Sequence, residues 1–530
     1  MKNNNYLIPL FIAVALALGF FLGKKNNAPF LQESNSGKIN NNSKHKLFKV
    51  MEVIKNEYVD SVSEKDLTDK TIDQLLSNLD PHSVYIPYQK DNREADAMRG
   101  NFAGVGVKFI ILNDTLYVTN VIENGPSAKA GLKNGDLVLK IDTTDVAGVG
   151  LKNEQVMKLL KGKPGTKVKV TILRQNKIQT KTIKRGLIPI KSVTAAFMLK
   201  EDVGYIRLVR FGETSSEEFY YASQKLLKQG MKKLVFDLRG NGGGYLQIAE
   251  QIVDEFLEKG KTVVFTKEKG GQKNYTYSTS KGGLKNIELA VLIDSESASA
   301  SEIVAGAIQD NDRGTIYGRR SFGKGLVQRQ LTLPDSSSLR ITIARYYTPT
   351  GRSIQKPYEK GNHYDYMMEL YDRDRNGELF KVDSTLFVDS LKFTTPAGKL
   401  VYGGGGIMPD YFIPYDTAGY SSFYRKIAYS RVLTEFSMKY LSSHRRELSS
   451  KSMNHFLKNF TVTDKLFYEF IDFAENKEIT GNSRQIQTSK QRLFNRIKEE
   501  IASGIWDEEG REYINSRNNK DIKSVLSNFN

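Results

Sequence analysis

The sequence predicts a multidomain protein of mixed α/β and α+β class. We expect an N-terminal helical segment, a compact α+β module, a core built on a mixed sheet, and a helical C-terminal region. First, 530 residues are too many for one ordinary hydrophobic core, so several structural units are expected. Second, short strands and glycine turns fill residues 99–187, whereas strand and helix patterns alternate from residue 200 to 350. Third, apolar residues recur at helical spacing beyond residue 415.

Composition and charge exclude several kinds of chemistry. The chain has no cysteine, which rules out disulfides, thiolate metal ligands and a cysteine nucleophile. Its net charge of +18 is spread along the whole length, and no nucleic-acid-binding signature accompanies it. We therefore expect no nucleic-acid partner, and the charge is explained more simply by solubility or by acidic surfaces of the cell envelope.

The N-terminus predicts export. Residues 6–23, "YLIPLFIAVALALGFFLG", carry no charge and reach roughly 27 Å as a helix, close to the thickness of a bilayer core. Residues 1–25 are therefore a membrane anchor or a signal peptide, and the anchor is favoured because no small-x-small cleavage site precedes Lys24. The expected location is the cell envelope, anchored in the inner membrane facing the periplasm or secreted to the periplasm.

Two further segments precede the first compact module. Residues 26–45 are rich in Asn and Ser, and we interpret them as a linker. Residues 46–98 have apolar side chains at spacings of three and four, which indicates a helical region. The string "LDPHSVYIP" at residues 79–87 interrupts that pattern, and packing or pairing is a simpler role for this region than chemistry.

Residues 99–187 resemble a PDZ domain. The resemblance rests on "NFAGVGVKF" and on "ENGPSAKAGLKNGDLVLKID" further along. In such a loop, glycines let backbone N–H groups turn toward the terminal carboxylate of a peptide, whose last residues add a strand to the sheet. An ordinary hairpin glycine pair is the alternative reading of the first string. The predicted peptide-binding residues are Gly104, Val105, Gly106 and Val107.

Residues 188–415 predict a partly parallel sheet covered by helices. Three strand patterns, "VGYIRLVRF", "KKLVFDLRG" and "IELAVLID", are separated by two helical patterns, "SSEEFYYASQKLLKQG" and "YLQIAEQIVDEFLEKG". Sites in such sheets lie beyond the carboxyl ends of strands, where "DLRGNGGGY" and "DSESASASE" are found. We also predict a hairpin in "LRITIARYYTPTGRSIQKPY" and a strand near "VYGGGGIMPDYFI". Residues 416–530 read as amphipathic helices without an assignable motif.

The serine-rich turn raises the question of a nucleophile and its base. A serine hydroxyl needs a base within hydrogen-bond reach. No histidine falls between residues 100 and 362, so a Ser-His-Asp triad would require one to fold back from outside. Lys324, between two glycines, offers an amine whose pKa burial could lower. From the residues alone, a Ser-Lys dyad and a merely polar turn remain equally open. The five histidines are His45, His82, His363, His444 and His455.

These segments together resemble the C-terminal processing peptidases, or tail-specific proteases. The matching strings are "DLRGNGGG", "SASASEI", "FGKGLVQ" and "YYTPTGRSIQ", in family order and behind a PDZ-like module, so that the resemblance covers residues 46–415. It implies a serine peptidase core of the ClpP/crotonase-like kind. Gly242 stands where the family often has proline, so we expect a looser loop at that position.

The resemblance assigns roles to individual residues. Ser299 would be the nucleophile and Lys324 the general base, with Gln328 holding the amine. Ala300 would donate its backbone N–H to the oxyanion at the start of a helix, together with a glycine N–H of the loop. We interpret Ser295, Ser297 and Ser301 as turn and cap residues. The glycine donors would be Gly243 and Gly244, and the site-supporting residues would be Glu302, Asp237, Arg239 and Asn241.

The sequence therefore predicts an exported serine endopeptidase. Its PDZ module would bind the exposed C-terminal tails of proteins, and the dyad would cleave them through an acyl-enzyme, without a metal or cofactor. Activity should rise toward alkaline pH as the lysine loses its proton. An inactive PDZ scaffold is the alternative, and a nucleotide enzyme is disfavoured because no phosphate-binding glycine string is present. The sequence leaves homo-oligomerisation open.

Overall fold

The computed structural model describes residues 41–383 and 388–529. Contacts divide the chain into two units, residues 1–70 and 71–530, and each is described by itself. The predicted membrane segment at residues 6–23 lies outside the described residues. Within the described ranges, no helix is both long enough and apolar enough to cross a bilayer.

The first unit is helical where it is described. Helix α2 spans Asn41–Glu57, and helix α3 (Glu64–Ser77) crosses the boundary between the units. Because α2 begins inside the stretch 26–45, the helical region starts earlier than we predicted. Asn and Ser are typical of linkers and are also common at helix starts, so composition alone did not locate this boundary.

A strand that we did not predict follows α3. Strand β1 (Val84–Ile86) lies within the string that interrupts the helical pattern, and it pairs antiparallel with β18 (Ser338–Tyr347). Helix α4 (Tyr88–Arg99) comes next and ends at Gly100, whose φ of 73° lies in the left-handed region that favours glycine. The proline-containing string therefore joins the core sheet instead of only separating helices.

The α+β module is built around an antiparallel sheet. Its elements are β2 (Asn101–Gly104), β3 (Val107–Leu112), β4 (Thr115–Val121), α5 (Pro126–Lys129), β5 (Leu137–Ile141), β6 (Thr144–Asp145), α6 (Asn153–Leu160), β7 (Lys167–Arg174), β8 (Lys177–Lys184) and β9 (Gly186–Pro189). The sheet has the order β3-β4-β5-β7-β8, β6 pairs with β5, and β2 pairs with β9. Val168, Val170 and Ile172 alternate along β7 and point into the buried core. This arrangement of one antiparallel sheet with two short helices fits the PDZ-like module that the sequence predicts.

The described part of the second domain contains three sheets: a six-stranded sheet, a five-stranded sheet that includes β1, and the two-stranded pair β19-β20. Its elements are β10 (Val193–Met198), β11 (Val203–Leu208), α7 (Ser215–Lys228), β12 (Lys233–Asp237), α8 (Leu246–Asp254), β13 (Thr262–Glu268), β14 (Lys273–Tyr277), β15 (Glu288–Ile293), α9 (Ala300–Asp310), β16 (Thr315–Gly318), β17 (Leu326–Thr332), β18, α10 (His363–Arg375), η2 (Asp389–Leu391), β19 (Lys392–Thr394), β20 (Leu400–Tyr402) and β21 (Tyr411–Phe412). The six-stranded sheet has the order β10-β11-β12-β15-β16-β21 and is parallel except for β10. This arrangement is the predicted mixed sheet.

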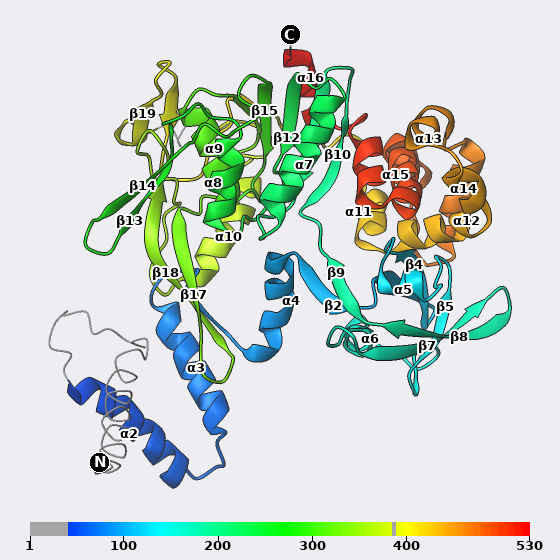
Figure 1. Cartoon of the computed structure of the whole chain (residues 1–530), viewed down its shortest axis with the longest axis horizontal. Coiled ribbons are helices and arrows are strands. Elements are labelled where there is room, and N and C mark those ends of the chain that lie inside the picture. Colours follow the sequence, from blue (N-terminus) through cyan, green and yellow to red (C-terminus); the bar gives the residue numbers. More distant parts are fainter. Residues whose placement is uncertain (1–40, 384–387, 530) are drawn as a thin grey trace, which may run out of the picture. The chain divides into compact units, whose positions relative to one another are not determined.

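Helices α7, α8 and α9 cover one face of this sheet (Figure 1). Apolar side chains of β11, β12 and β15 alternate between the two faces, as expected for strands buried on both sides. Because β12 and β15 are parallel neighbours, the loops that follow them start at the same edge of the sheet. The sheet therefore brings the "DLRGNGGG" loop and the serine turn together.

The predicted hairpin lies elsewhere in the sequence. We expected "LRITIARYYTPTGRSIQKPY" to fold back on itself, but its first part is a single long strand, β18. Strand β18 pairs instead with the preceding strand β17, across a turn at Pro334–Ser337. A strand is present at the start of this string, but its antiparallel partner β17 precedes it in the sequence.

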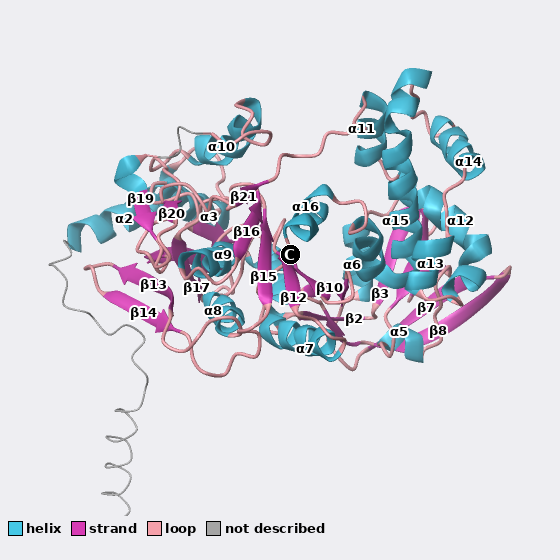
Figure 2. Cartoon of the chain, turned by 90° about the horizontal axis from the view of Figure 1, so that it is seen from above, coloured by secondary structure: helices cyan, strands magenta, loops and turns pink. Residues whose placement is uncertain are grey.

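The C-terminal region is helical, as predicted. Its helices are α11 (Ser422–Tyr429), α12 (Val432–Ser449), α13 (Met453–Asn459), α14 (Asp464–Glu475), α15 (Ser483–Asn515) and α16 (Lys520–Asn528). Helices α11 to α15 share one hydrophobic core. Helix α16 does not, because Ile522 and Val525 are fully buried against the six-stranded sheet, on the face opposite α7 to α9 (Figure 2). The last helix of the chain thus belongs to the core of the preceding domain.

Candidate active site

The serine turn connects β15 to α9 and holds one residue in an unusual conformation. Ser299 precedes the first helical residue, Ala300, and has φ 55° and ψ −112°. Such a conformation in a non-glycine residue costs about 1 to 3 kcal/mol and persists only where surrounding contacts hold it. The backbone N–H of Ser299 donates to Oε2 of Glu302 at 2.8 Å. Strain of this kind is frequent at nucleophiles on strand-to-helix turns.

Two neighbouring serines hold the turn in place. Ser297 Oγ donates to the carbonyl of Leu238 at 2.9 Å, and Ser301 Oγ donates to the carbonyl of Asn241 at 2.7 Å. Both hydroxyls are buried and both acceptors lie in the loop after β12. Of these three serines, Ser299 is therefore the one whose hydroxyl does not bond the loop after β12.

Lys324, the general base that we predicted, lies close to this turn. Its Nζ donates to Oε1 of Gln328 at 2.8 Å. Burial of the amine, aided by the charge of Arg340, lowers the pKa of Lys324 to about 8. A large fraction of this amine is therefore neutral under mildly alkaline conditions, which an ordinary lysine is not.

Two buried groups tie the backbone of Lys324 to that of Ser299. Oε2 of Glu302 accepts both the Ser299 N–H and the Lys324 N–H, the latter at 2.9 Å. The hydroxyl of Tyr346 bridges the carbonyls of the same two residues. Within the described residues the Ser299 hydroxyl and the Lys324 amine do not hydrogen-bond, but catalytic bonds are often long before substrate binds.

Glu302 is the central acceptor of the site. Besides Oε2, its Oε1 accepts from the Gly323 N–H at 2.7 Å and from Ser321 Oγ at 2.5 Å. The side chain is completely buried, and that burial raises the pKa of Glu302 even though its donors favour the carboxylate. Glu302 thus fixes the two segments that carry Ser299 and Lys324.

The loop after β12 is held by the residues that we predicted to support it. Burial alone would raise the pKa of Asp237, but Arg239 and Arg207 hold that pKa well below its usual range. Asn241 Nδ2 donates to the carbonyl of Leu208 at 2.9 Å. The carbonyl of Asn241 accepts the Ala298 N–H at 3.0 Å, directly beside Ser299. The loop and the serine turn are therefore one hydrogen-bonded unit.

Only some of the predicted oxyanion donors are available in this structure. The Gly243 N–H donates to Asn241 Oδ1 at 2.9 Å and is engaged. The N–H groups of Ala300 and Gly244 have no acceptor among the described residues. A Cβ at Gly243 would come within 2.8 Å of the Ser299 Cβ, so glycine is required there for close approach. Asn241 thus takes up one of the two glycine donors that we predicted, a detail set by its rotamer.

Residues 80–83 also reach the site, although they belong to the helical region for which we predicted a packing role. Gln328 Nε2 donates to the carbonyl of His82, and Ser83 Oγ donates to the buried Asp80. Burial, with the Lys324 charge, lowers the pKa of His82 to about 3, and its Nε2 contacts the Tyr366 hydroxyl at 2.9 Å. The histidine is therefore close to Lys324 yet poorly suited to act as a base. Only the proline-containing break at residues 79–87 hinted at this segment.

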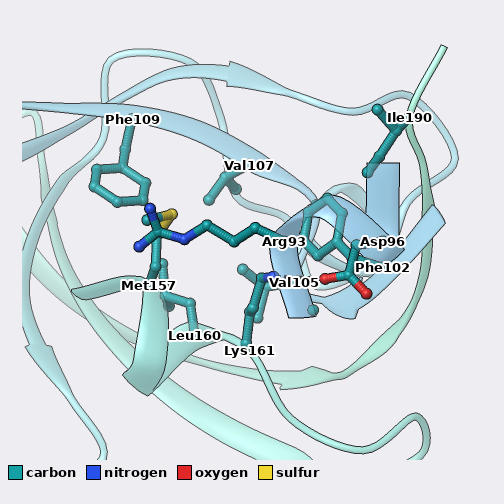
Figure 3. A pocket seen from close by; sticks show the side chains of 12 residues that line it. Arg93, Asp96, Phe102, Val105, Val107, Phe109, Met157, Leu160, Lys161 and Ile190 are labelled. Atoms are coloured by element: carbon teal, nitrogen blue, oxygen red, sulfur yellow. Dashed lines mark hydrogen bonds and ion pairs between the residues drawn. The ribbon is translucent and has the colours of Figure 1, made fainter. Parts of the chain in front are cut away.

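The predicted carboxylate-binding loop lines a pocket of about 260 Å³ (Figure 3). Gly106 has φ 75°, which glycine adopts without strain, and the carbonyl of Val105 accepts from Ser127. Its charged lining residues are Arg93, Lys161 and Asp96, and the Lys161 amine pairs with the Asp96 carboxylate at 2.8 Å. The rest of the lining is mainly apolar. The apolar side chains that line it are Phe102, Val105, Val107, Phe109, Met157, Leu160 and Ile190.

Four family models match segments of this chain. The family model "Peptidase family S41" matches residues 202–366, the PDZ domain model matches 103–184, and "Activating protease CtpB N-terminal domain" matches 17–90. A "Family of unknown function (DUF8443)" matches residues 423–507, in the region where we found no motif.

Two curated relatives have informative names. The carboxy-terminal-processing protease of Bartonella bacilliformis is 37% identical over 313 residues, which is 58% of this chain and 71% of that protein. The carboxy-terminal processing protease CtpB of Bacillus subtilis is 35% identical over 59% of this chain and 65% of its own length. A solved photosystem II D1 C-terminal processing protease is 27% identical over 58% of this chain and 89% of its own, with a TM-score of 0.33.

The family models and these relatives define a serine-type peptidase with a PDZ domain. The chain belongs to the carboxy-terminal processing protease family.

Proposed function

We propose that this protein cleaves exported proteins whose C-terminal tails bind its PDZ groove, using Ser299 as nucleophile and Lys324 as general base. The observation that carries this proposal is the Lys324 amine, whose pKa of about 8 suits a base, on a segment that Glu302 ties to the strained Ser299. The uncharged run at residues 6–23, which we predict to be an anchor or signal peptide, supports a place in the cell envelope, anchored in the inner membrane and facing the periplasm, or secreted there.

The proposed reaction proceeds by acyl transfer. Neutral Lys324 accepts the proton of the Ser299 hydroxyl while Oγ attacks the scissile carbonyl, and the Ala300 and Gly244 N–H groups stabilise the oxyanion. The Lys324 ammonium then protonates the departing amine, which leaves an ester on Ser299. A water molecule, deprotonated by the neutral amine, hydrolyses that ester and regenerates the serine. Gln328 keeps the amine oriented through these steps.

The groove favours tails that end in apolar residues. Its lining is mainly apolar, and the backbone loop at residues 104–107 is suited to hold a terminal carboxylate. Charged terminal side chains would lose hydration there without a full set of partners.

This preference is tested with two unfolded reporter proteins that differ only in the last two residues, Ala-Ala or Asp-Asp. We expect the Ala-Ala reporter to be cleaved with a kcat/KM about 10-fold higher or more, because apolar contacts with the groove contribute on the order of a few kcal/mol of binding free energy. Met157→Glu, which places charge in the groove, should raise KM for that reporter and leave kcat near wild type. Lys158→Glu on the exposed side of α6 is the matched control. Equal cleavage of both reporters would exclude tail recognition by this groove.

A further inference from the structure

Helix α16, near the C-terminus, presents a buried carboxylate to both loops of the site. Asp521 is 7% exposed, and its Oδ2 accepts from Arg239 Nη1 at 2.8 Å. The same oxygen accepts from both terminal nitrogens of Arg319 at 3.3 Å. Because Ile522 and Val525 are fully buried against the sheet, the helix holds this carboxylate in one place.

The two arginines lie in two different segments of the site, here called its arms. One arm is the loop after β12 with the Ser299 turn that it bonds, and the other is residues 319–324. Arg239 lies in the loop after β12, two residues before Asn241, which bonds the nucleophile turn. Arg319 follows β16 directly and begins the segment that leads to Ser321, Gly323 and Lys324. One carboxylate from a distant part of the sequence therefore joins the arm of the nucleophile to the arm of the base.

Further polar contacts of Arg239 extend this network. Arg239 also donates to Asn519 Oδ1 at 3.1 Å and pairs with Asp237, which accepts from the buried Tyr205 hydroxyl at 2.7 Å. The charged members Asp237, Arg239, Arg319 and Asp521 are all buried, whereas Asn519 is half-buried. Removal of one charge from such a cluster leaves the others uncompensated. The arginines would then have to move toward water, and the loops would move with them.

We propose that Asp521 is a positioning residue for the peptidase reaction: it sets the distance between the Ser299 turn and the Lys324 segment from the opposite face of the sheet. This inference rests on the proposed Ser299–Lys324 chemistry. Displacement of either arm by about 1 Å costs on the order of 10²-fold in rate, so the effect belongs in kcat and not in KM. Helix α16 is therefore part of the catalytic domain in function as well as in packing.

The test uses the full chain with Asp521→Asn, the rescue variant Asp521→Glu, and Lys523→Ala on the exposed side of the same helix as the control. Competent sites are counted with a serine-reactive fluorophosphonate probe, so that misfolded molecules do not enter kcat. We expect Asp521→Asn to lose 10-fold to 100-fold in kcat per site with KM within twofold of wild type. Asp521→Glu should recover part of the loss, and Lys523→Ala should match wild type.

A pH profile separates positioning from a purely structural role. In Asp521→Asn, the midpoint of acylation should move upward from pH 8, because a loosened Lys324 gains water and its pKa returns toward that of an exposed lysine. If Asp521→Asn does not fold, Arg319→Gln is measured instead. This variant keeps the ion pair between Asp521 and Arg239, and it should show the same kcat loss and the same upward shift of the pH midpoint.

The outcomes that oppose this inference are distinct from those that oppose the function. Wild-type kcat per site and an unchanged pH midpoint in the folded Asp521→Asn or Arg319→Gln protein would overturn it, provided that Ser299→Ala is inactive. Activity that persists in Ser299→Ala would instead overturn the proposed function. An equal kcat loss in Lys523→Ala would also overturn the role of Asp521.

Discussion

Replacement of Ser299 or Lys324 by Ala is expected to reduce kcat by about 10³-fold or more for cleavage of an unfolded protein with an apolar tail. Without Ser299 there is no oxygen to carry the acyl group, and without Lys324 there is no neutral amine to take its proton. Because the two residues act in one step, the double variant should be hardly slower than either single variant.

Steady-state kinetics and fluorophosphonate labelling check this prediction. Ser295→Ala and Lys360→Ala serve as controls, because Ser295 lies in the serine turn and Lys360 is an exposed lysine, and neither has a place in the proposed reaction. Near-wild-type cleavage by either folded single variant would remove the dyad from the mechanism.

The stability of Lys324→Met should change in the opposite direction to its activity. The pKa of Lys324 is lower in the folded chain, about 8, than in the unfolded chain, where it is 10.5. The unfolded chain therefore binds more protons between these values, so stability rises with pH across this window, and at pH 7 the buried ammonium destabilises the fold. Replacing it with Met should raise the free energy of unfolding at pH 7 by up to about 3 kcal/mol.

The second large effect is expected at Glu302. Glu302→Gln replaces one carboxylate oxygen by an NH₂ group. Two of the four groups that donate hydrogen bonds to this side chain therefore lose their acceptor. Each unsatisfied buried donor costs about 1 to 3 kcal/mol, which predicts a loss of about 2 to 6 kcal/mol in the free energy of unfolding. The segments of Ser299 and Lys324 also separate, so kcat should fall on the order of 10²-fold.

Urea unfolding and kinetics on the same protein samples measure both consequences. Glu296→Gln in the exposed part of the same turn is the control, and it should change neither quantity by much. A stable Glu302→Gln protein with wild-type kcat would show that Glu302 does not position the dyad.

Local patterns predicted the parts of the site that depend on local structure. The apolar runs and glycine stops around residues 203–254 and 288–310 predicted the strands and helices in their correct order, because buried parallel strands and amphipathic helices have distinct periodicities. The parallel order then placed "DLRGNGGG" and "SASASEI" at one sheet edge. The roles given to individual residues there came from the family resemblance and remain to be tested.

Contacts between distant segments could not be predicted in the same way. Nothing near Asp521 in the sequence indicates that its partners are Arg239 and Arg319, and nothing near His82 indicates that its carbonyl accepts from Gln328. Such pairs depend on how a whole helix or strand packs, which a single sequence does not encode locally. The engagement of the Gly243 N–H likewise depends on the side-chain conformation of one asparagine.

The most direct test of the account is the pH dependence of Ser299 acylation in wild type and in Lys324→Ala, measured as the rate of fluorophosphonate labelling between pH 6 and 10. The predicted result is a rate that rises with a midpoint near pH 8 in wild type, where the Lys324 amine becomes neutral, and no such step in the variant. A wild-type rate that falls steadily from pH 6 to 9 with the fold intact, or an identical step in Lys324→Ala, would contradict the lysine base.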